Sequence, residues 1–207
     1  MSLLTGFTAG LSLITLSELG DKTFFIAAIL AMRHPRRWVF FGAIAALFLM
    51  TVLSVLLGQV AAIFSQVYVK GVAAALFIGF GIKLLYDALK MSGKKGLVSE
   101  QADAKKAVEQ SEKSILTWSV RAVVVEAFTL TFIGEWGDRT QLATITLAAA
   151  NNPYGVLIGA TSGHAICAAI AVICGKFMAK RISERLLTAI GGALFIIFGI
   201  ATAQQMT

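Results

Sequence analysis

The sequence predicts an all-α, polytopic membrane protein with six transmembrane helices, arranged as two inverted three-helix repeats. Three observations lead to this fold class: the composition is strongly apolar, six apolar stretches follow one another, and one acidic motif occurs twice. Of the 207 residues, 57% are hydrophobic and only 14% are charged, whereas a soluble domain has roughly 25% charged residues. The apolar surface is therefore expected to face lipid.

Each apolar stretch reaches the roughly 20 residues that a helix needs to cross a bilayer. The stretches cover residues 3–32, 38–64, 69–89, 118–150, 154–177 and 186–204. Between the third and the fourth, the chain is polar with charges that alternate in sign, which is typical of a solvated linker with a short helix near residues 101–112 rather than of a site. We expect three parts: repeat 1 (1–90), a polar cytoplasmic linker (91–117) and repeat 2 (118–207).

The two repeats are visible as matching segments at an almost constant offset. Residues 18–23 (ELGDKT) recur as residues 135–140 (EWGDRT), and residues 75–82 (ALFIGFGI) recur as residues 193–200 (ALFIIFGI). Each repeat holds three membrane crossings. Because three is an odd number, the second repeat must enter the membrane from the opposite side, as in inverted-repeat transporters.

The distribution of Lys and Arg predicts the orientation. These residues gather in the first, third and fifth connections, whereas the opposite side, both termini included, holds only Lys70. By the positive-inside rule the basic side is cytoplasmic, so both termini lie on the non-cytoplasmic side. The positive charge forms no basic face interleaved with exposed aromatic residues, so we expect no nucleic-acid partner.

The duplicated motif carries the chemistry. It falls near the middle of the first and fourth stretches, where a charge persists only if it is compensated or used. A Glu and an Asp three residues apart share one helical face, and the intervening Gly20 or Gly137 lets the helix break or lets backbone carbonyls approach an ion. If the two faces meet, a carboxylate cage suited to Ca²⁺, Mg²⁺ or Mn²⁺ results. Its predicted ligands are Glu18, Asp21, Glu135 and Asp138.

Two basic residues complete the predicted site. Lys22 and Arg139 each lie four residues after a motif Glu and can pair with it. Four acids and two bases leave a charge of −2, which one divalent cation neutralises. When the cation leaves, the carboxylates repel one another and take up protons, which is the chemistry of an antiporter. The competing interpretation is that these ion pairs only hold the helices together.

Other polar residues have two interpretations each. Glu126 is either a proton relay or an interfacial group, and His164 is an additional ligand, a proton carrier or a packing residue. Neutral oxygens near the cage could come from Thr23, Thr140, Thr144 and Gln141, although threonines in membrane helices often bond only their own backbone. Lys83 and Asp87, four residues apart, predict a local ion pair.

The duplicated Glu-x-Gly-Asp-Lys/Arg-Thr motif, within six helices and around a polar central loop, resembles a family of small divalent cation/proton exchangers with Golgi, chloroplast and cyanobacterial members. The short chain most resembles the cyanobacterial manganese exporters. The resemblance implies export of Mn²⁺ and Ca²⁺ from the cytoplasm against protons, with the four motif acids as ligands. It also implies a bacterial plasma membrane or a cyanobacterial thylakoid membrane. The cation would be bound transiently, and no prosthetic group is expected.

Two other functions remain open at this stage. An acidic-ring divalent cation channel would differ by a flux that follows the cation gradient alone. An exporter of small organic cations, such as basic amino acids, would use the aromatic residues near the acids. We expect no enzyme, because His164 has no obvious nucleophile partner and no metalloprotease-type helix motif is present. Ligand type alone does not separate Mn²⁺ from Ca²⁺, and the sequence indicates no oligomeric state.

Overall fold

The computed structural model describes residues 2–90, 95–112, 119–181 and 184–204, and every regular element within them is an α-helix. The first half holds α1 (Leu3–Glu18), α2 (Lys22–Arg33), α3 (Arg36–Ala61) and α4 (Gln66–Lys90). After α5 (Lys95–Glu112), the second half holds α6 (Val120–Glu135), α7 (Arg139–Ala150), α8 (Pro153–Arg181) and α9 (Glu184–Gln204). The predicted all-α class is confirmed.

Within the described residues, three helical segments are long and apolar enough to cross a membrane. They are Arg36–Ala61, Val67–Lys90 and Pro153–Cys174, and two shorter apolar helices are Leu3–Glu18 and Thr188–Gln204. The first and fourth apolar stretches of the sequence do not form single helices of about 30 residues. Each divides at the acidic motif, into α1 and α2 or into α6 and α7.

Both divisions occur at a glycine in the left-handed backbone region. Gly20 has φ 85° and Gly137 has φ 81°, a conformation that residues with a Cβ adopt only at a cost. Glu18 ends α1, and Asp21 is the N-cap of α2. The two acids of a motif therefore flank a break, and the expectation that they share one helical face is wrong.

Helices of the two halves pack against each other. α1 lies along α8, α6 lies along α3, and α4 lies along α9. Glycines permit these close approaches, which are common between membrane helices. A Cβ added at Gly10 in α1 would lie 2.9 Å from the backbone nitrogen of Ala160, and one at Gly42 in α3 would lie 2.5 Å from the carbonyl oxygen of Val124.

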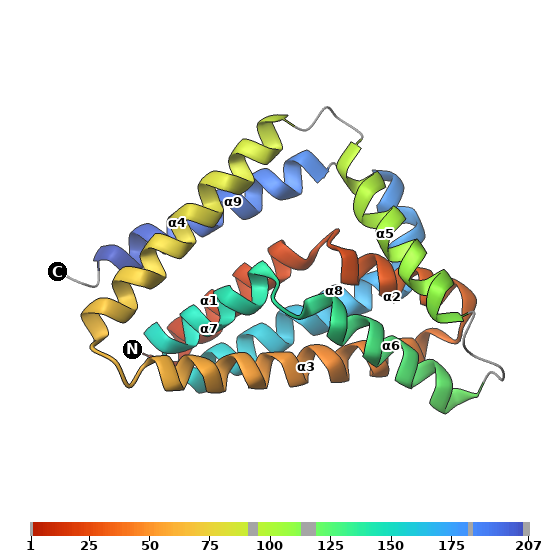
Figure 1. Cartoon of the computed structure of the whole chain (residues 1–207), viewed down its shortest axis with the longest axis horizontal. Helices are drawn as coiled ribbons and strands as arrows, with labels where there is room; N and C mark the ends of the chain where they lie inside the picture. Colours follow the sequence, from red (N-terminus) through yellow and green to blue (C-terminus); the bar gives the residue numbers. More distant parts are fainter. Residues whose placement is uncertain (1, 91–94, 113–118, 182–183, 205–207) are drawn as a thin grey trace.

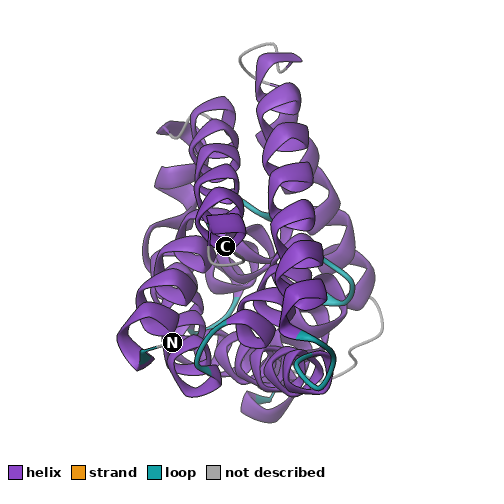
Figure 2. Cartoon of the chain, turned by 90° about the vertical axis from the view of Figure 1, so that its left-hand side faces the viewer, coloured by secondary structure: helices purple, strands orange, loops and turns teal. Residues whose placement is uncertain are grey.

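The figures show how the halves are oriented. The path from α1 to α2 and the path from α6 to α7 run in opposite directions (Figure 1). Both termini lie at one end of the molecule, α5 lies at the other end, and the end view of Figure 2 has both termini toward the viewer.

The linker helix is longer than expected and is docked on the protein. α5 begins at Lys95 rather than near residue 101, and its Ala104 and Val108 are fully buried in an apolar cluster with residues of α2. Arg33, at the end of α2, pairs with Glu112 and, at 3.8 Å, with Glu109. The polar linker thus includes a packed helix, whereas the alternating charges had indicated a solvated connection.

Candidate cation site

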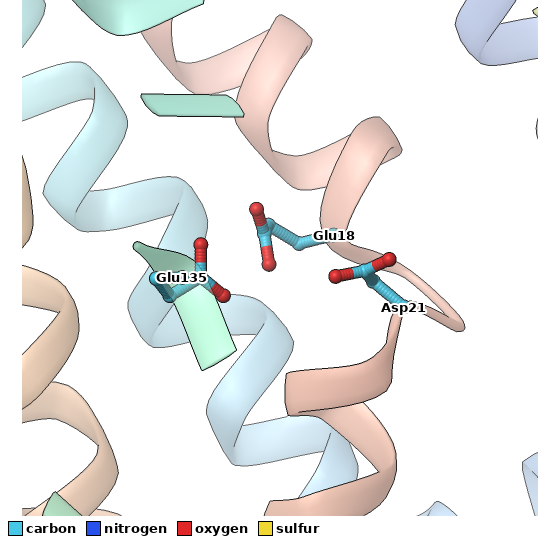
Figure 3. A group of neighbouring side chains, drawn as sticks. All are labelled: Glu18, Asp21 and Glu135. Atoms are coloured by element: carbon cyan, nitrogen blue, oxygen red, sulfur yellow. The ribbon is translucent and has the colours of Figure 1, made fainter. Parts of the chain in front are cut away.

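Three carboxylates from the two halves meet inside the helical bundle. Glu18, Asp21 and Glu135 each offer an oxygen that lies within 4.8 Å of the oxygens of the other two (Figure 3). Glu18 and Glu135 are almost completely buried, with 3% and 2% of their surfaces exposed. Two of these acids come from the α1–α2 break and one from the end of α6. We call these three residues the acidic cluster.

The threonine at the end of each motif is hydrogen-bonded to the buried glutamate of the same motif. The Thr23 hydroxyl donates to Glu18 Oε2 at 3.4 Å, and the Thr140 hydroxyl donates to Glu135 Oε2 at 3.3 Å. Both threonines lie in the first turn after the break, so the break itself turns them back toward the glutamate that precedes it. Thr23 and Thr140, predicted as candidate neutral oxygen donors, therefore lie directly against the cluster.

Asp138 is not a member of the acidic cluster. Its Oδ2 lies 3.3 Å from the Thr140 hydroxyl, whose one proton it shares with Glu135, and its Oδ1 lies 3.8 Å from Arg139 Nε. The structure thus brings together three of the four predicted ligands, with the fourth bound to its neighbours.

The basic residues behave differently from the predicted pattern. Arg139 Nη2 donates to Asp21 Oδ1 at 3.5 Å, so it bridges the aspartates of both motifs and does not pair with Glu135. Lys22 forms no ion pair with any carboxylate of the described residues. The reason is geometric: the break after each glutamate removes the helical register that would place a base four residues later beside it.

The remaining neutral candidates are committed to the backbone. Gln141 Oε1 accepts a hydrogen bond from the Gly137 N–H at 2.7 Å, which stabilises the second break. The Thr144 hydroxyl donates to the Thr140 carbonyl at 2.8 Å within α7, as the competing interpretation of membrane threonines predicts. Glu126 is buried in α6, with 4% exposed, and belongs to no group of clustered ligand atoms among the described residues.

A cavity of about 460 Å³ leads to the acidic cluster from the side of α4, α5 and α9. Its charged lining residues are Asp21, Lys22, Lys83, Asp87, Glu100, Asp138 and Arg139. Lys83 and Asp87 both lie on this cavity and form no ion pair with each other, so that prediction is wrong.

Glu100 is a cavity residue that the sequence did not reveal. It belongs to α5, where acidic and basic residues alternate, so the sequence pattern does not distinguish one acid from the others. Burial raises the pKa of the Glu100 carboxyl above its ordinary value, and the positive charge of Arg139 partly offsets this effect. The linker helix therefore contributes an acid to the path that ends at the acidic cluster.

Membrane-compatible helices that break around buried, mutually facing carboxylates are typical of ion transporters. Comparison with known proteins agrees with this class. The family described as divalent cation/proton antiporter GDT1 matches residues 6–92 and 123–207. The chain belongs to the GDT1 family of divalent cation/proton antiporters, which confirms the resemblance and defines a membrane transporter of cations and protons.

Relatives match over nearly the whole chain. A GDT1-like protein of Synechocystis sp. is 54% identical over 204 residues, which cover 97% of each chain. GDT1-like protein 5 of Arabidopsis thaliana is 44% identical, over 96% of this chain and 95% of its own. GDT1-like protein 3 of Oryza sativa subsp. indica is 42% identical, over 94% of this chain and 72% of its own. No solved structure matches significantly.

Proposed function

We propose that this chain exports Mn²⁺ or Ca²⁺ from the cytoplasm in exchange for protons, and that the acidic cluster binds the cation. One observation carries the proposal: three carboxylates from separate halves approach within 4.8 Å in the protein interior. Like charges at this distance repel strongly when water is excluded. The cluster is stable only with a cation or protons bound, and either one excludes the other.

The ligand chemistry supports a hard divalent cation. Carboxylate oxygens suit Mn²⁺ and Ca²⁺ rather than a soft metal. Asp21 already has Arg139 as an ionic partner, whereas Glu18 and Glu135 have threonine hydroxyls and no basic partner among the described residues. Their two negative charges would be neutralised by one divalent cation or by two protons. This predicts an exchange of two protons for each cation.

The arrangement of the helices supports alternating access between two inverted repeats of residues 1–90 and 118–207, joined by the linker 91–117. The two broken helices run in opposite directions, as inverted repeats require (Figure 1). The basic residues of the α2–α3 turn lie at the end that α5 occupies. By the positive-inside rule this end is cytoplasmic, the termini face away from the cytoplasm, and the large cavity opens to the cytoplasm.

The proposed membrane is a bacterial plasma membrane or a cyanobacterial thylakoid membrane. The similarity to the Synechocystis protein supports a cyanobacterial setting. In either membrane the proton gradient points into the cytoplasm, which would supply the driving force for cation export.

The test uses purified protein in liposomes that contain a pH dye and a Mn²⁺ or Ca²⁺ indicator. The wild type is compared with Glu18→Gln and Glu135→Gln, and with Glu109→Gln on α5 as a matched control outside the cluster. We expect opposed cation and proton movements in the wild type and the control, and loss of both in the two cluster variants.

Other outcomes would redirect the assignment. A cation flux that ignores a pH gradient would identify a channel. Uptake of arginine or lysine instead of metal would identify an organic-cation exporter. Full exchange by both cluster variants would remove the acidic cluster from the mechanism.

A further inference from the structure

A second, small cavity is lined in part by Glu18 and is separate from the large cavity. It measures about 10 Å³ and shares no lining residue with the large cavity. Its polar lining residues are Glu18 of α1, Thr23 of α2, Thr131 of α6, and His164 and Cys167 of α8. The other lining residues are apolar: Phe24, Ala27, Ala43, Leu47 and Ala168.

Three of the atoms around this cavity need a hydrogen-bond partner. Glu18 Oε1, Thr131 Oγ1 and His164 Nδ1 are buried and have no partner among the described residues. Their residues are only 3%, 1% and 5% exposed. Leaving a buried polar atom unpaired costs free energy, so such atoms are nearly always satisfied by protein or by an ordered water.

The cavity has the size and the polarity of a water site. A volume of roughly 10–15 Å³ holds one water, which needs two to four polar partners, whereas cavities that stay dry have apolar walls. Three unsatisfied polar atoms on one cavity of this size meet both conditions.

We propose that one buried water joins His164 and Thr131 to Glu18, and that His164 is thereby a positioning residue for cation binding. This inference rests on the proposed role of Glu18 as a cation ligand. A carboxylate has about four acceptor sites, so Glu18 can accept from Thr23 and the water and still bind a cation. The two bonds fix the carboxylate plane toward Asp21 and Glu135 before the cation arrives.

The site belongs to one half of the molecule. At the shared offset, Leu47 stands where α8 has His164, and Ile14 stands where α6 has Thr131. Leu47 itself lines the small cavity. The polar pair of His164 and Thr131 therefore has no polar equivalent at the matching positions of the first half.

The test measures Mn²⁺ binding to the purified full chain by calorimetry, together with KM and kcat in liposomes. Removing a group that hydrogen-bonds to a metal ligand and orients it typically weakens metal binding by roughly 10- to 100-fold. We expect His164→Leu to raise the Kd and the KM by about tenfold, with a much smaller change in kcat. His164→Gln, which keeps a hydrogen-bonding group, should recover most of the loss.

A double variant shows whether one water connects the two residues. Thr131→Val keeps the shape of the side chain and should raise the Kd in the same direction. Both residues act through one water. The Kd of the double variant, His164→Leu with Thr131→Val, should therefore not exceed the higher of the two single-variant Kd values. Thr51→Val is the matched control: Thr51 is 2% exposed, and its hydroxyl donates to the Leu47 carbonyl at 2.8 Å. It should leave the Kd unchanged.

Two results would overturn the inference: a wild-type Kd in His164→Leu, or effects of the two substitutions that multiply in the double variant. If His164→Leu does not fold, Thr131→Val and His164→Gln decide the question by the same Kd measurement. Failure of the proposed function looks different, since the wild type would then show no coupled exchange or Glu18→Gln would remain active.

Discussion

The two helix breaks have the same backbone conformation but differ in the contacts of their side chains. Gly20 and Gly137 have φ angles within a few degrees of each other, and an aspartate caps the helix that follows each of them. Yet Asp21 joins the acidic cluster, whereas Asp138 is bound to Thr140 and Arg139. A duplicated motif therefore preserves the break without preserving the role of each acid.

The difference arises from the residues after the break. Arg139 is long enough to reach Asp21 of the other motif, while Lys22 occupies the equivalent position without an ion pair among the described residues. Gln141 accepts from the Gly137 N–H, and the equivalent Phe24 has no side-chain acceptor. The second break therefore has a side-chain hydrogen bond to its glycine, which the first break lacks among the described residues. This asymmetry gives three predictions.

The largest effect should separate the two aspartates. Asp21→Asn removes a charge from the acidic cluster, so we expect kcat/KM for cation exchange to fall by more than about 100-fold, beyond the usual effect of a supporting residue. Asp138→Asn removes a supporting charge, and a loss of about tenfold is expected. Exchange assays in liposomes measure both. Equal losses would mean that the two motifs bind the cation symmetrically.

An intermediate effect should appear in stability. Gly20→Ala and Gly137→Ala force a Cβ into the left-handed region, which costs roughly 1–2 kcal/mol for each residue. A Cβ at Gly137 meets no atom within 4 Å, so its cost is conformational alone. Thermal unfolding in detergent should show a lower midpoint for both variants.

The control for this prediction is Gly79→Ala in α4, where an added Cβ also meets nothing within 4 Å. Gly79 is helical, so alanine should not destabilise the protein there. An unchanged midpoint for Gly137→Ala would show that the break does not depend on the left-handed conformation.

The smallest effect should come from exchanging the two bases. Arg139→Lys loses the planar group that spans Asp21 and Asp138. Because the Arg139 side chain is 38% exposed, the expected rise in KM is at most about fivefold, as for a solvent-screened pair. Lys22→Arg should leave KM unchanged. A larger effect at Lys22 than at Arg139 would reverse the assigned asymmetry.

The sequence was informative where a pattern is local. The all-α class, the apolar helices and the burial of the motif acids Glu18 and Glu135 could be predicted from composition and duplication. The freedom of Gly20 and Gly137 also indicated a possible break. A break, however, changes the direction of every later side chain, so ion pairs predicted from helical spacing, such as Arg139 with Glu135, could not be correct.

Contacts between distant segments were not predictable in the same way. Glu100 lines the cavity only because α5 docks beside it. The alternating charges of this segment had suggested a solvated linker instead. A weak signal was present, because Ala104 and Val108 are four residues apart and mark one apolar face. The sequence marked His164 as a candidate ligand, proton carrier or packing residue. Its place on one small cavity with Glu18 had no local signal, since α1 and α8 meet only in the folded molecule.

The packing of α1 has a consequence for how the protein is made. Its principal contacts are with α7, α8 and α9, all of which belong to the second half. During synthesis the first glutamate of the acidic cluster therefore enters the membrane long before the helices that bury it exist. Neither half completes its own interior, so α1 gains its main packing partners only after the second half of the chain has been made.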